Sequence, residues 1–341
     1  MKAAVYYNNK DIRIEEMSVP KIGAGELLVK IIASGICGSD VMEWYRIKKA
    51  PLVLGHEIAG EVVEVGEGVE KFKKGDRVTV AHHVPCNTCH YCFEGNYSLC
   101  DTLRSTNFDP GGFCEYVRVP SINVDRGTFL LPDEVTYEEA TFAEPLACVL
   151  RGQRIAGFKP GDSVLVIGSG ISGLLHIKLA KALGAGRIIA TDINEFRIDS
   201  AKKCGADAVF NAKNFNADLL KDANGGRLAD LVILCAGAVP ALKQALKSVD
   251  RGGTLLLFAL PEPGTEVAVD FWNLWRDGIT ITSSYAGPPG DTTTAIELLR
   301  AKRVDVKDLI THRLTLDETA EGFRLVAEAQ NSIKVIILPQ E

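Results

Sequence analysis

No apolar run in this 341-residue sequence is long enough to span a lipid bilayer. The first ten residues lack the basic start, apolar stretch and small-residue cleavage site of a secretory signal. The sequence also lacks an excess of positive charge, since its formal net charge is −6. Nucleic-acid-binding surfaces depend on lysine and arginine to neutralise phosphates. These absences argue against a membrane, secreted or nucleic-acid-binding protein and favour a cytoplasmic protein that acts on small molecules.

The length and the change of pattern along the chain predict two domains. Residues 1–149 contain short strands punctuated by glycine, at residues 26–33, 58–65, 77–81 and 113–119. In residues 150–285 strands alternate with helices, beginning with strands at 163–167 and 187–191. Parallel strands need crossover connections, so this alternation predicts a doubly wound parallel sheet with helices on both faces. We therefore expect an α/β protein with a mostly β domain and a doubly wound domain; the pattern alone does not assign residues 286–341.

Nine cysteines are an odd number for a disulfide framework, and in a chain expected in the cytoplasm they favour metal binding or catalysis. Cys86, Cys89, Cys92 and Cys100 have the spacing Cys-x2-Cys-x2-Cys-x7-Cys. Zinc prefers four thiolates in a tetrahedron, and two-residue spacings let one loop present successive sulfurs to one centre. An iron–sulfur cluster or four ordinary buried thiols are the alternatives. Four protein sulfurs leave no open position, so this zinc is expected to be structural.

A second metal site is predicted from three separate segments. Cys37 follows one strand, His56 precedes another, and Glu144 stands before a proline near the end of the first domain. Each residue alone is more often a core, hydrogen-bonded or helix-start residue. Together they supply one thiolate, one imidazole and one carboxylate, a set that leaves a fourth zinc position for substrate. Zinc there would lower the pKa of a bound alcohol and thereby favour loss of hydride from the adjacent carbon.

The segment after residues 163–167 runs from Gly168 to Gly173 and has the pattern Gly-x-Gly-x-x-Gly. Its candidate coenzyme-binding residues are Gly168, Gly170, Ile171, Ser172 and Gly173. Placed between a strand and a helix, this pattern is typical of a loop that binds a dinucleotide pyrophosphate.

Asp192 follows Gly173 by nineteen residues, at the end of the next predicted strand, where a carboxylate binds the adenosine ribose. It would repel a 2′-phosphate, so NAD is favoured over NADP. Arg197 could serve such a phosphate, but an arginine beside an intact acid more often pairs with it or packs along the adenine.

Taken in order, these motifs resemble those of the zinc-containing medium-chain alcohol dehydrogenases. Further matching segments are Gly111-Gly-Phe-Cys-Glu-Tyr116 and Glu144-Pro-Leu, and the resemblance covers essentially the whole chain. The latter segment looks most like the polyol branch, which includes sorbitol, galactitol and butanediol dehydrogenases; threonine dehydrogenases are near neighbours. The resemblance implies a GroES-like catalytic domain (1–149, completed by 286–341), a Rossmann NAD-binding domain (150–285) and an active site in the cleft between them.

Further roles follow from the resemblance. It implies that Cys37, His56 and Glu144 hold the catalytic zinc, with Glu57 close enough to compete with water for the open position. It also implies that Ser39 takes the substrate hydroxyl proton toward the nicotinamide ribose; an ordinary turn hydroxyl is the alternative. A homotetramer is implied, with a dimer as the alternative.

The chain departs from its relatives at two places. Many have a proton-relay histidine where this chain has Met42, so water or a group such as Glu43 must replace it. Several sorbitol dehydrogenases have an arginine where this chain has Ser284, which argues against sorbitol itself. The predicted function is therefore zinc-dependent hydride transfer between NAD(H) and a small secondary alcohol or polyol. L-Threonine 3-dehydrogenase-like oxidation is one alternative, and a non-catalytic zinc-binding scaffold is another.

Overall fold

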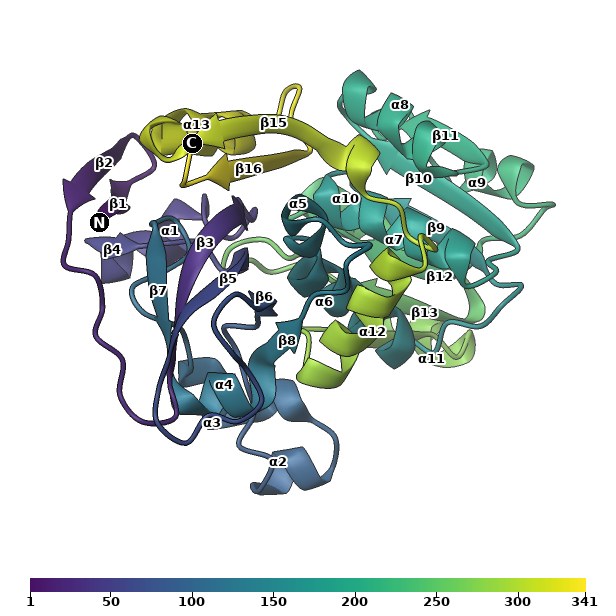
Figure 1. Ribbon diagram of the computed structural model, residues 1–341. Coiled ribbons are helices and arrows are strands. Elements are labelled where there is room, and N and C mark those ends of the chain that lie inside the picture. Colours follow the sequence, from purple (N-terminus) through teal and green to yellow (C-terminus); the bar gives the residue numbers. More distant parts are fainter. The chain divides into compact units, whose positions relative to one another are not determined.

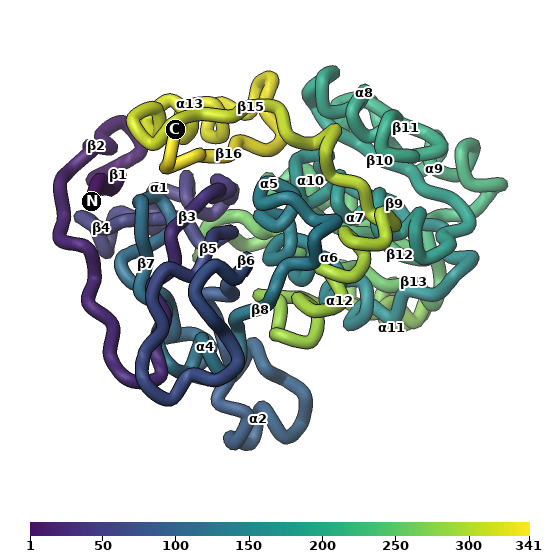
Figure 2. Tube along the Cα trace, viewed as in Figure 1, coloured from purple at the N-terminus to yellow at the C-terminus, as the bar shows by residue number.

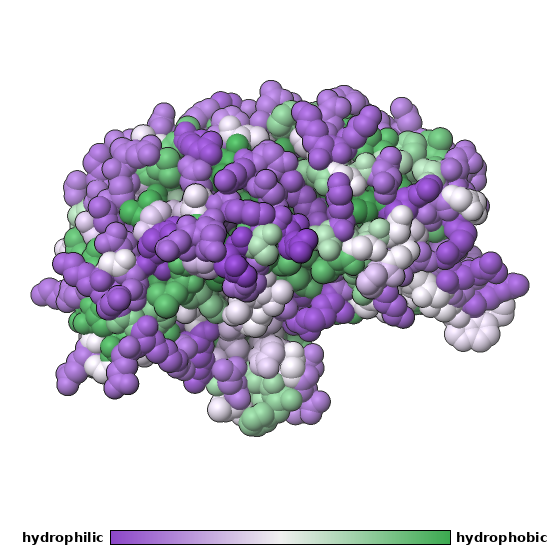
Figure 3. Space-filling model, turned by 45° about the vertical axis from the view of Figure 1, so that its right-hand side comes forward, coloured by the Kyte–Doolittle hydropathy of each residue, from purple (hydrophilic) through white to green (hydrophobic).

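The computed structural model describes residues 1–341, which form two compact units. Unit 1 consists of Met1–Ala147 and Ala286–Glu341, and unit 2 consists of Cys148–Tyr285. Both chain termini therefore belong to unit 1, as the trace in Figure 2 shows. None of the helices combines the length and the apolarity needed to cross a bilayer. Hydrophilic side chains cover most of the face drawn in Figure 3.

Unit 1 is built on a seven-stranded sheet whose main order is β15-β16-β3-β5-β6-β8, with β7 also paired to β3 (Figure 1). Its strands are β3 (Leu27–Gly35), β5 (Glu57–Val65), β6 (Arg77–Val80), β7 (Tyr116–Val119), β8 (Thr128–Leu130), β15 (Ile310–Thr315) and β16 (Lys334–Leu338). A three-stranded sheet has the order β2-β1-β4 and consists of β1 (Lys2–Asn8), β2 (Asp11–Glu16) and β4 (Leu52–Val53). β16 pairs antiparallel with β3, so the C-terminal segment completes a sheet that the N-terminal segment begins.

β-Branched side chains form much of the core of unit 1. Val29, Ile31, Val62, Val335 and Ile337 lie in one buried cluster and come from β3, β5 and β16. Such residues favour strands because their branched side chains pack well on a pleated surface. The predicted strand at 113–119 begins only at Tyr116, where regular pairing with β3 starts; Cys114, before it, forms an isolated bridge with Ala3.

Most helices of unit 1 are short and connect strands. They are α1 (Glu43–Arg46), η1 (Ile47–Lys49), α2 (His90–Phe93), η2 (Tyr97–Leu99), α3 (Asp101–Ser105), α4 (Ser121–Gly127), α5 (Tyr137–Ala140), α12 (Pro289–Arg300), η3 (Lys307–Leu309), η4 (Leu316–Glu318) and α13 (Thr319–Glu328). α6 (Ala143–Ile155) begins in unit 1 and ends in unit 2. A capping box between Thr136 and Glu139 satisfies backbone groups at the start of α5.

Unit 2 contains a six-stranded sheet in the order β11-β10-β9-β12-β13-β14, in which all neighbouring strands are parallel. Its strands are β9 (Ser163–Ile167), β10 (Arg187–Asp192), β11 (Ala208–Asn211), β12 (Ala229–Leu234), β13 (Val249–Leu257) and β14 (Thr280–Ser283). Its helices, besides the end of α6, are α7 (Ile171–Ala182), α8 (Glu195–Cys204), α9 (Ala217–Ala223), α10 (Val239–Leu246) and α11 (Phe271–Arg276). The strand order reverses at β9, which is the order of a dinucleotide-binding Rossmann fold. The predicted doubly wound sheet is confirmed.

Candidate metal centres and dinucleotide loop

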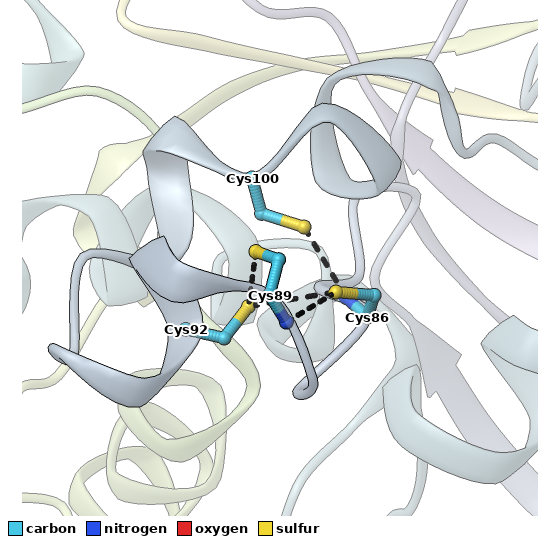
Figure 4. A group of neighbouring side chains, drawn as sticks. All are labelled: Cys86, Cys89, Cys92 and Cys100. Atoms are coloured by element: carbon cyan, nitrogen blue, oxygen red, sulfur yellow. Dashed lines mark hydrogen bonds between the residues drawn. The ribbon is translucent and has the colours of Figure 1, made fainter.

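The four clustered cysteines meet in the loop between β6 and β7 (Figure 4). Their sulfurs all lie within 4.8 Å of one another, and none forms a disulfide. The Sγ of Cys92 is 3.5 Å from that of Cys89 and 3.9 Å from that of Cys86. A tetrahedron with Zn–S bonds near 2.3 Å has an edge of about 3.8 Å. The four sulfurs are therefore spaced to hold one zinc ion.

Hydrogen bonds within the loop favour a thiolate at Cys86. The backbone N–H groups of Thr88 and Cys89 both donate to Cys86 Sγ, at 3.4 and 3.2 Å. Hydrogen bonds from Thr88 lower the pKa of Cys86 to about 5. Cys100 Sγ accepts from the backbone N–H of Cys86 at 3.3 Å. The loop has a small apolar core, formed by Cys92, Cys100 and Leu103, so a bound metal would be its main internal support.

The second group begins in the turn that follows β3. Cys37 and Ser39 are half-buried there, and Asp40 is fully buried. The Asp40 carboxylate accepts from the backbone N–H of Cys37 at 3.0 Å, which closes the turn. The backbone N–H and the hydroxyl of Ser39 both lie 3.4 Å from Cys37 Sγ and donate to it. The turn thus presents a sulfur and a hydroxyl side by side.

His56 and Glu57 reach the same place from the start of β5. One side-chain ligand atom from each of Cys37, His56 and Glu57 lies within 4.8 Å of the others. His56 Nδ1 is 3.4 Å from Asp40 Oδ1, so Asp40 supports both the cysteine turn and the imidazole. An acid that orients a ligating histidine is common beside bound metals.

The electrostatics of this group suit a cation. Burial lowers the pKa of His56, but the negative charges of Asp40 and Cys37 outweigh it and hold that pKa well above its usual value. The His56 position therefore favours positive charge. A thiolate, an imidazole and a carboxylate are zinc ligands, and a zinc ion would supply the charge that the site favours. The residues present fit a zinc ion.

Glu57 also forms a buried ion pair with Lys334 of β16. The Lys334 side chain is 0% exposed and that of Glu57 is 2% exposed. Burial raises the pKa of Glu57 to about 7; the charge of Lys334 lowers it and that of Glu144 raises it. A Cβ at Gly35 would lie 2.6 Å from Lys334 Cε and would collide with Glu57, so a side chain there would displace the ends of this pair.

Glu144 lies in the first turn of α6, outside the compact group of three ligand atoms. Its charge acts on Glu57, so the two carboxyl groups interact electrostatically. The assignment of Glu144 as the third zinc ligand stays a prediction.

Three further residues lie around the group, and none of them was among the residues predicted to form a site. The His56 ring lies 4.7 Å from the His82 ring, which in turn lies 3.8 Å from that of His83. Burial and the charges of His56 and Arg46 lower the pKa of both His82 and His83, to about 4 for His83. Arg46 donates to Ser39. The adjacent His82-His83 pair, directly after β6, was a signal available in the sequence.

The glycine-rich loop of unit 2 joins β9 to α7, which begins at Ile171. Gly168 has a φ of 94°, and a Cβ there would lie 2.9 Å from Ala236 and 3.0 Å from the Cys235 backbone. A Cβ at Gly173 would collide with the Gly168 carbonyl oxygen. Both positions therefore require glycine, as a tight strand-to-helix turn does.

Asp192, the last residue of β10, is 7% exposed and faces this loop. Its carboxylate accepts from the backbone N–H of Ser169 at 2.7 Å and from that of Asn194 at 3.0 Å. A side chain at Gly170 would meet the Arg197 guanidinium at 3.7 Å. The loop, the predicted ribose acid and Arg197 are therefore brought together in unit 2.

Two family models match the chain. The alcohol dehydrogenase GroES-like domain matches residues 23–127, and the zinc-binding dehydrogenase domain matches residues 172–301. A sorbitol dehydrogenase from Bacillus subtilis (strain 168) is 35% identical, and the match covers 99% of this chain and 97% of that protein. The chain belongs to the zinc-binding dehydrogenases. The predicted family and the predicted GroES-like and Rossmann architecture are thereby confirmed.

Other members of this dehydrogenase family are equally similar. An L-threonine 3-dehydrogenase from Pyrococcus furiosus is 37% identical over 95% of this chain and 94% of its own length. A crystal structure of a zinc-binding dehydrogenase from Sinorhizobium meliloti 1021, bound to NADP, has a TM-score of 0.87 and 28% identity over 99% of both chains. The prediction of an enzyme is confirmed, and the scaffold alternative is not supported.

Proposed function

We propose that this dehydrogenase transfers a hydride between NAD(H) and a small secondary alcohol or polyol. The observation that carries the proposal is the convergence of Cys37, His56 and Glu57 beside the hydroxyl of Ser39, in a chain that also has a Rossmann dinucleotide loop. In this proposal unit 1 is the catalytic domain and unit 2 the NAD-binding domain.

Cys37, His56 and Glu144 would hold the catalytic zinc, with Glu57 able to enter its coordination shell, and the four-cysteine loop would hold the structural zinc. A zinc ion in the first site would act as a Lewis acid that lowers the pKa of a substrate hydroxyl and polarises the carbonyl of the product. The chain's own contribution is to orient these groups: Asp40 positions His56, and Lys334 compensates the charge of Glu57.

NAD would bind over the loop from Gly168 to Gly173, including Ile171 and Ser172 at the start of α7, and its nicotinamide would accept the hydride. The Asp192 carboxylate would accept hydrogen bonds from the adenosine ribose hydroxyls and repel a 2′-phosphate. Arg197 would contact a phosphate of the bound coenzyme, because its guanidinium lies beside Gly170.

Ser39 would take the substrate hydroxyl proton. Its hydroxyl is next to Cys37 Sγ, so a substrate oxygen near the metal group would lie within reach of it. Proton transfer by a positioned group of this kind typically contributes about 10² to 10⁴ in rate.

Oxidation of L-threonine at its secondary hydroxyl is the second candidate, supported by the identity to the Pyrococcus enzyme. The same zinc group and the same Ser39 would serve it. The two candidates differ in what binds the rest of the substrate: threonine brings an ammonium and a carboxylate, whereas a polyol brings only hydroxyls.

The experiment that tests the proposal is a screen of polyols, simple secondary alcohols and L-threonine as substrates for NAD reduction. The absorbance of the NADH formed is the readout. Cys37→Ser is the control variant. We expect turnover with at least one alcohol by the wild type and loss of that turnover in Cys37→Ser. Full turnover by the variant would refute the assignment of Cys37, and no turnover with any alcohol would refute the proposed function.

We also propose that the enzyme is a cytoplasmic homotetramer, with a dimer as the alternative. Its nine cysteines are free thiols, which suits a reducing compartment. β14 is an edge strand, and the preceding α11 exposes three large aromatic side chains, Phe271 at 77%, Trp272 at 64% and Trp275 at 73%. An unprotected edge beside exposed aromatics is a natural surface for a second copy of the chain.

A further inference from the structure

Arg46 makes an unusual set of contacts with Ser39. Its Nη2 donates to Ser39 Oγ at 3.0 Å, and its Nε donates to the Ser39 carbonyl oxygen at 2.9 Å. The two arms of one guanidinium therefore hold both the hydroxyl and the backbone of the residue proposed to take the substrate proton. A planar guanidinium holds such a two-point geometry better than an ammonium does.

Arg46 is itself held in place. Its Nη2 lies 3.4 Å from the fully buried Asp40 carboxylate, and its guanidinium stacks on the Tyr45 ring at 4.9 Å. Its side chain is 16% exposed. The arginine is therefore a fixed part of the site and not a mobile surface group.

The neighbouring residues do not supply the missing proton relay. Met42 carries no titratable group. Glu43, the replacement that the sequence suggests, accepts from the backbone N–H of Asn9 at 3.4 Å and makes no contact with Ser39. Arg46 is the charged side chain that touches the Ser39 hydroxyl.

We propose that Arg46 is a positioning residue for the transfer of the substrate hydroxyl proton. A hydroxyl has one hydrogen and two lone pairs. Arg46 occupies one lone pair, which leaves the second to accept the substrate proton. The hydroxyl hydrogen, which points to Cys37 Sγ at 3.4 Å, is the one that is given away. This inference rests on the proposed alcohol oxidation.

The step balances as follows. The substrate O–H bond breaks and its proton bonds to Ser39 Oγ, while the original Ser39 O–H bond breaks and that proton passes to water. Ser39 is neutral before and after the step. Arg46 exchanges no proton in this step; its guanidinium N–H groups hold Ser39 Oγ and the Ser39 carbonyl oxygen in place while the protons move.

The test follows the proton itself. The enzyme–NAD complex is mixed with 2,2,2-trifluoroethanol, an alcohol that resists oxidation, and the released proton is followed with a pH indicator. Arg46→Gln removes the positive charge and the two-point contact of the guanidinium with Ser39. Arg46→Lys keeps the charge but not the planar guanidinium. Lys48→Gln is the matched control, because Lys48 is an exposed cation two residues away with no contact to Ser39. Zinc content and NADH binding are measured for every variant.

We expect proton release and kcat in Arg46→Gln to fall by about 10- to 100-fold, with KM changed by less than about threefold. Arg46→Lys should recover part of the loss, and Lys48→Gln should match the wild type, with zinc content and NADH binding retained throughout. Wild-type proton release by Arg46→Gln would overturn the inference. So would an equal loss in both Arg46 variants that follows a loss of zinc, because Arg46 would then only support His56 through Asp40.

Failure of the proposed function has a different signature. In that case the wild-type enzyme itself would oxidise no alcohol and release no proton with trifluoroethanol.

Discussion

At the scale of single residues, the buried pair of Glu57 and Lys334 is the most demanding feature of unit 1. The two residues are 277 positions apart in the sequence and meet because β16 pairs with β3, which in turn pairs with β5. Two buried charges are tolerated only when they are paired, and removing one leaves the other uncompensated. Glu57 is also one of the three grouped ligand residues, so a change in this pair would affect the metal group.

Replacing Lys334 by methionine should therefore lower the free energy of unfolding by about 3–5 kcal/mol. The double variant Glu57→Gln, Lys334→Met should recover part of this loss, because no charge remains buried. Urea denaturation measures the free energy of unfolding of the single and the double variant. Lys2→Met, which breaks the exposed pair with Asp317, is the control and should cost less than about 1 kcal/mol. Equal losses in the two single variants would contradict this interpretation.

A second residue-scale prediction concerns the coenzyme. Asp192→Gly removes the carboxylate proposed to bind the ribose and to repel a 2′-phosphate. Its kcat/KM with NAD should fall by about tenfold or more, while the ratio of NADP to NAD use rises. Steady-state kinetics with both coenzymes provide the measurement, and an unchanged preference would count against Asp192.

At the scale of elements, the contact between α6 and α7 contains a buried histidine. His176 of α7 is 0% exposed. Gln153 Nε2 of α6 lies 3.3 Å from His176 Nδ1 and donates to the His176 carbonyl oxygen at 2.9 Å. The His176 ring meets the Phe258 ring edge-on at 4.6 Å. Burial lowers the pKa of His176 to about 3.

The stability of this packing should depend on pH. The folded-state pKa lies below the ordinary value near 6.5, so the unfolded chain binds more protons between these two values. Stability is complete above about pH 6.5 and falls as the pH drops toward 3, by about 2 kcal/mol at pH 5.

The variant His176→Gln should lose less stability than the wild type between pH 8 and pH 5, because it has no imidazole to protonate. Thermal or urea unfolding at several pH values gives the comparison. His312→Gln, at a half-buried histidine outside unit 2, should behave like the wild type. Identical pH dependence in all three proteins would argue against a role for His176.

At the scale of the whole molecule, the sequence predicted what depends on short-range spacing. The four cysteines lie within fifteen positions, and the strand predicted at 163–167 has the bounds of β9. Contacts between distant segments were not predictable: Lys334 reaches Glu57 only through sheet pairing, and the place of residues 286–341 followed from resemblance alone. Arg46 was missed because no spacing rule connects it to Ser39.

Assembly also belongs to this scale. If β14 and α11 form the interface between copies, Trp275→Glu should place a charge in an apolar contact and reduce the assembly to smaller species. Sedimentation velocity at several concentrations measures the change. Lys243→Glu, on α10 of the same unit, provides a surface control. An unchanged assembly in Trp275→Glu would place the interface elsewhere.

The central claim is that Cys37 helps to hold a zinc ion that is separate from the one in the four-cysteine loop. The most direct measurement is the zinc content per chain of freshly purified wild type and of Cys37→Ser, determined by elemental analysis. The account predicts about two zinc ions per chain in the wild type and about one in the variant, since the four-cysteine site would be untouched. Equal zinc content in the two proteins, or no transition metal in the wild type, would contradict it.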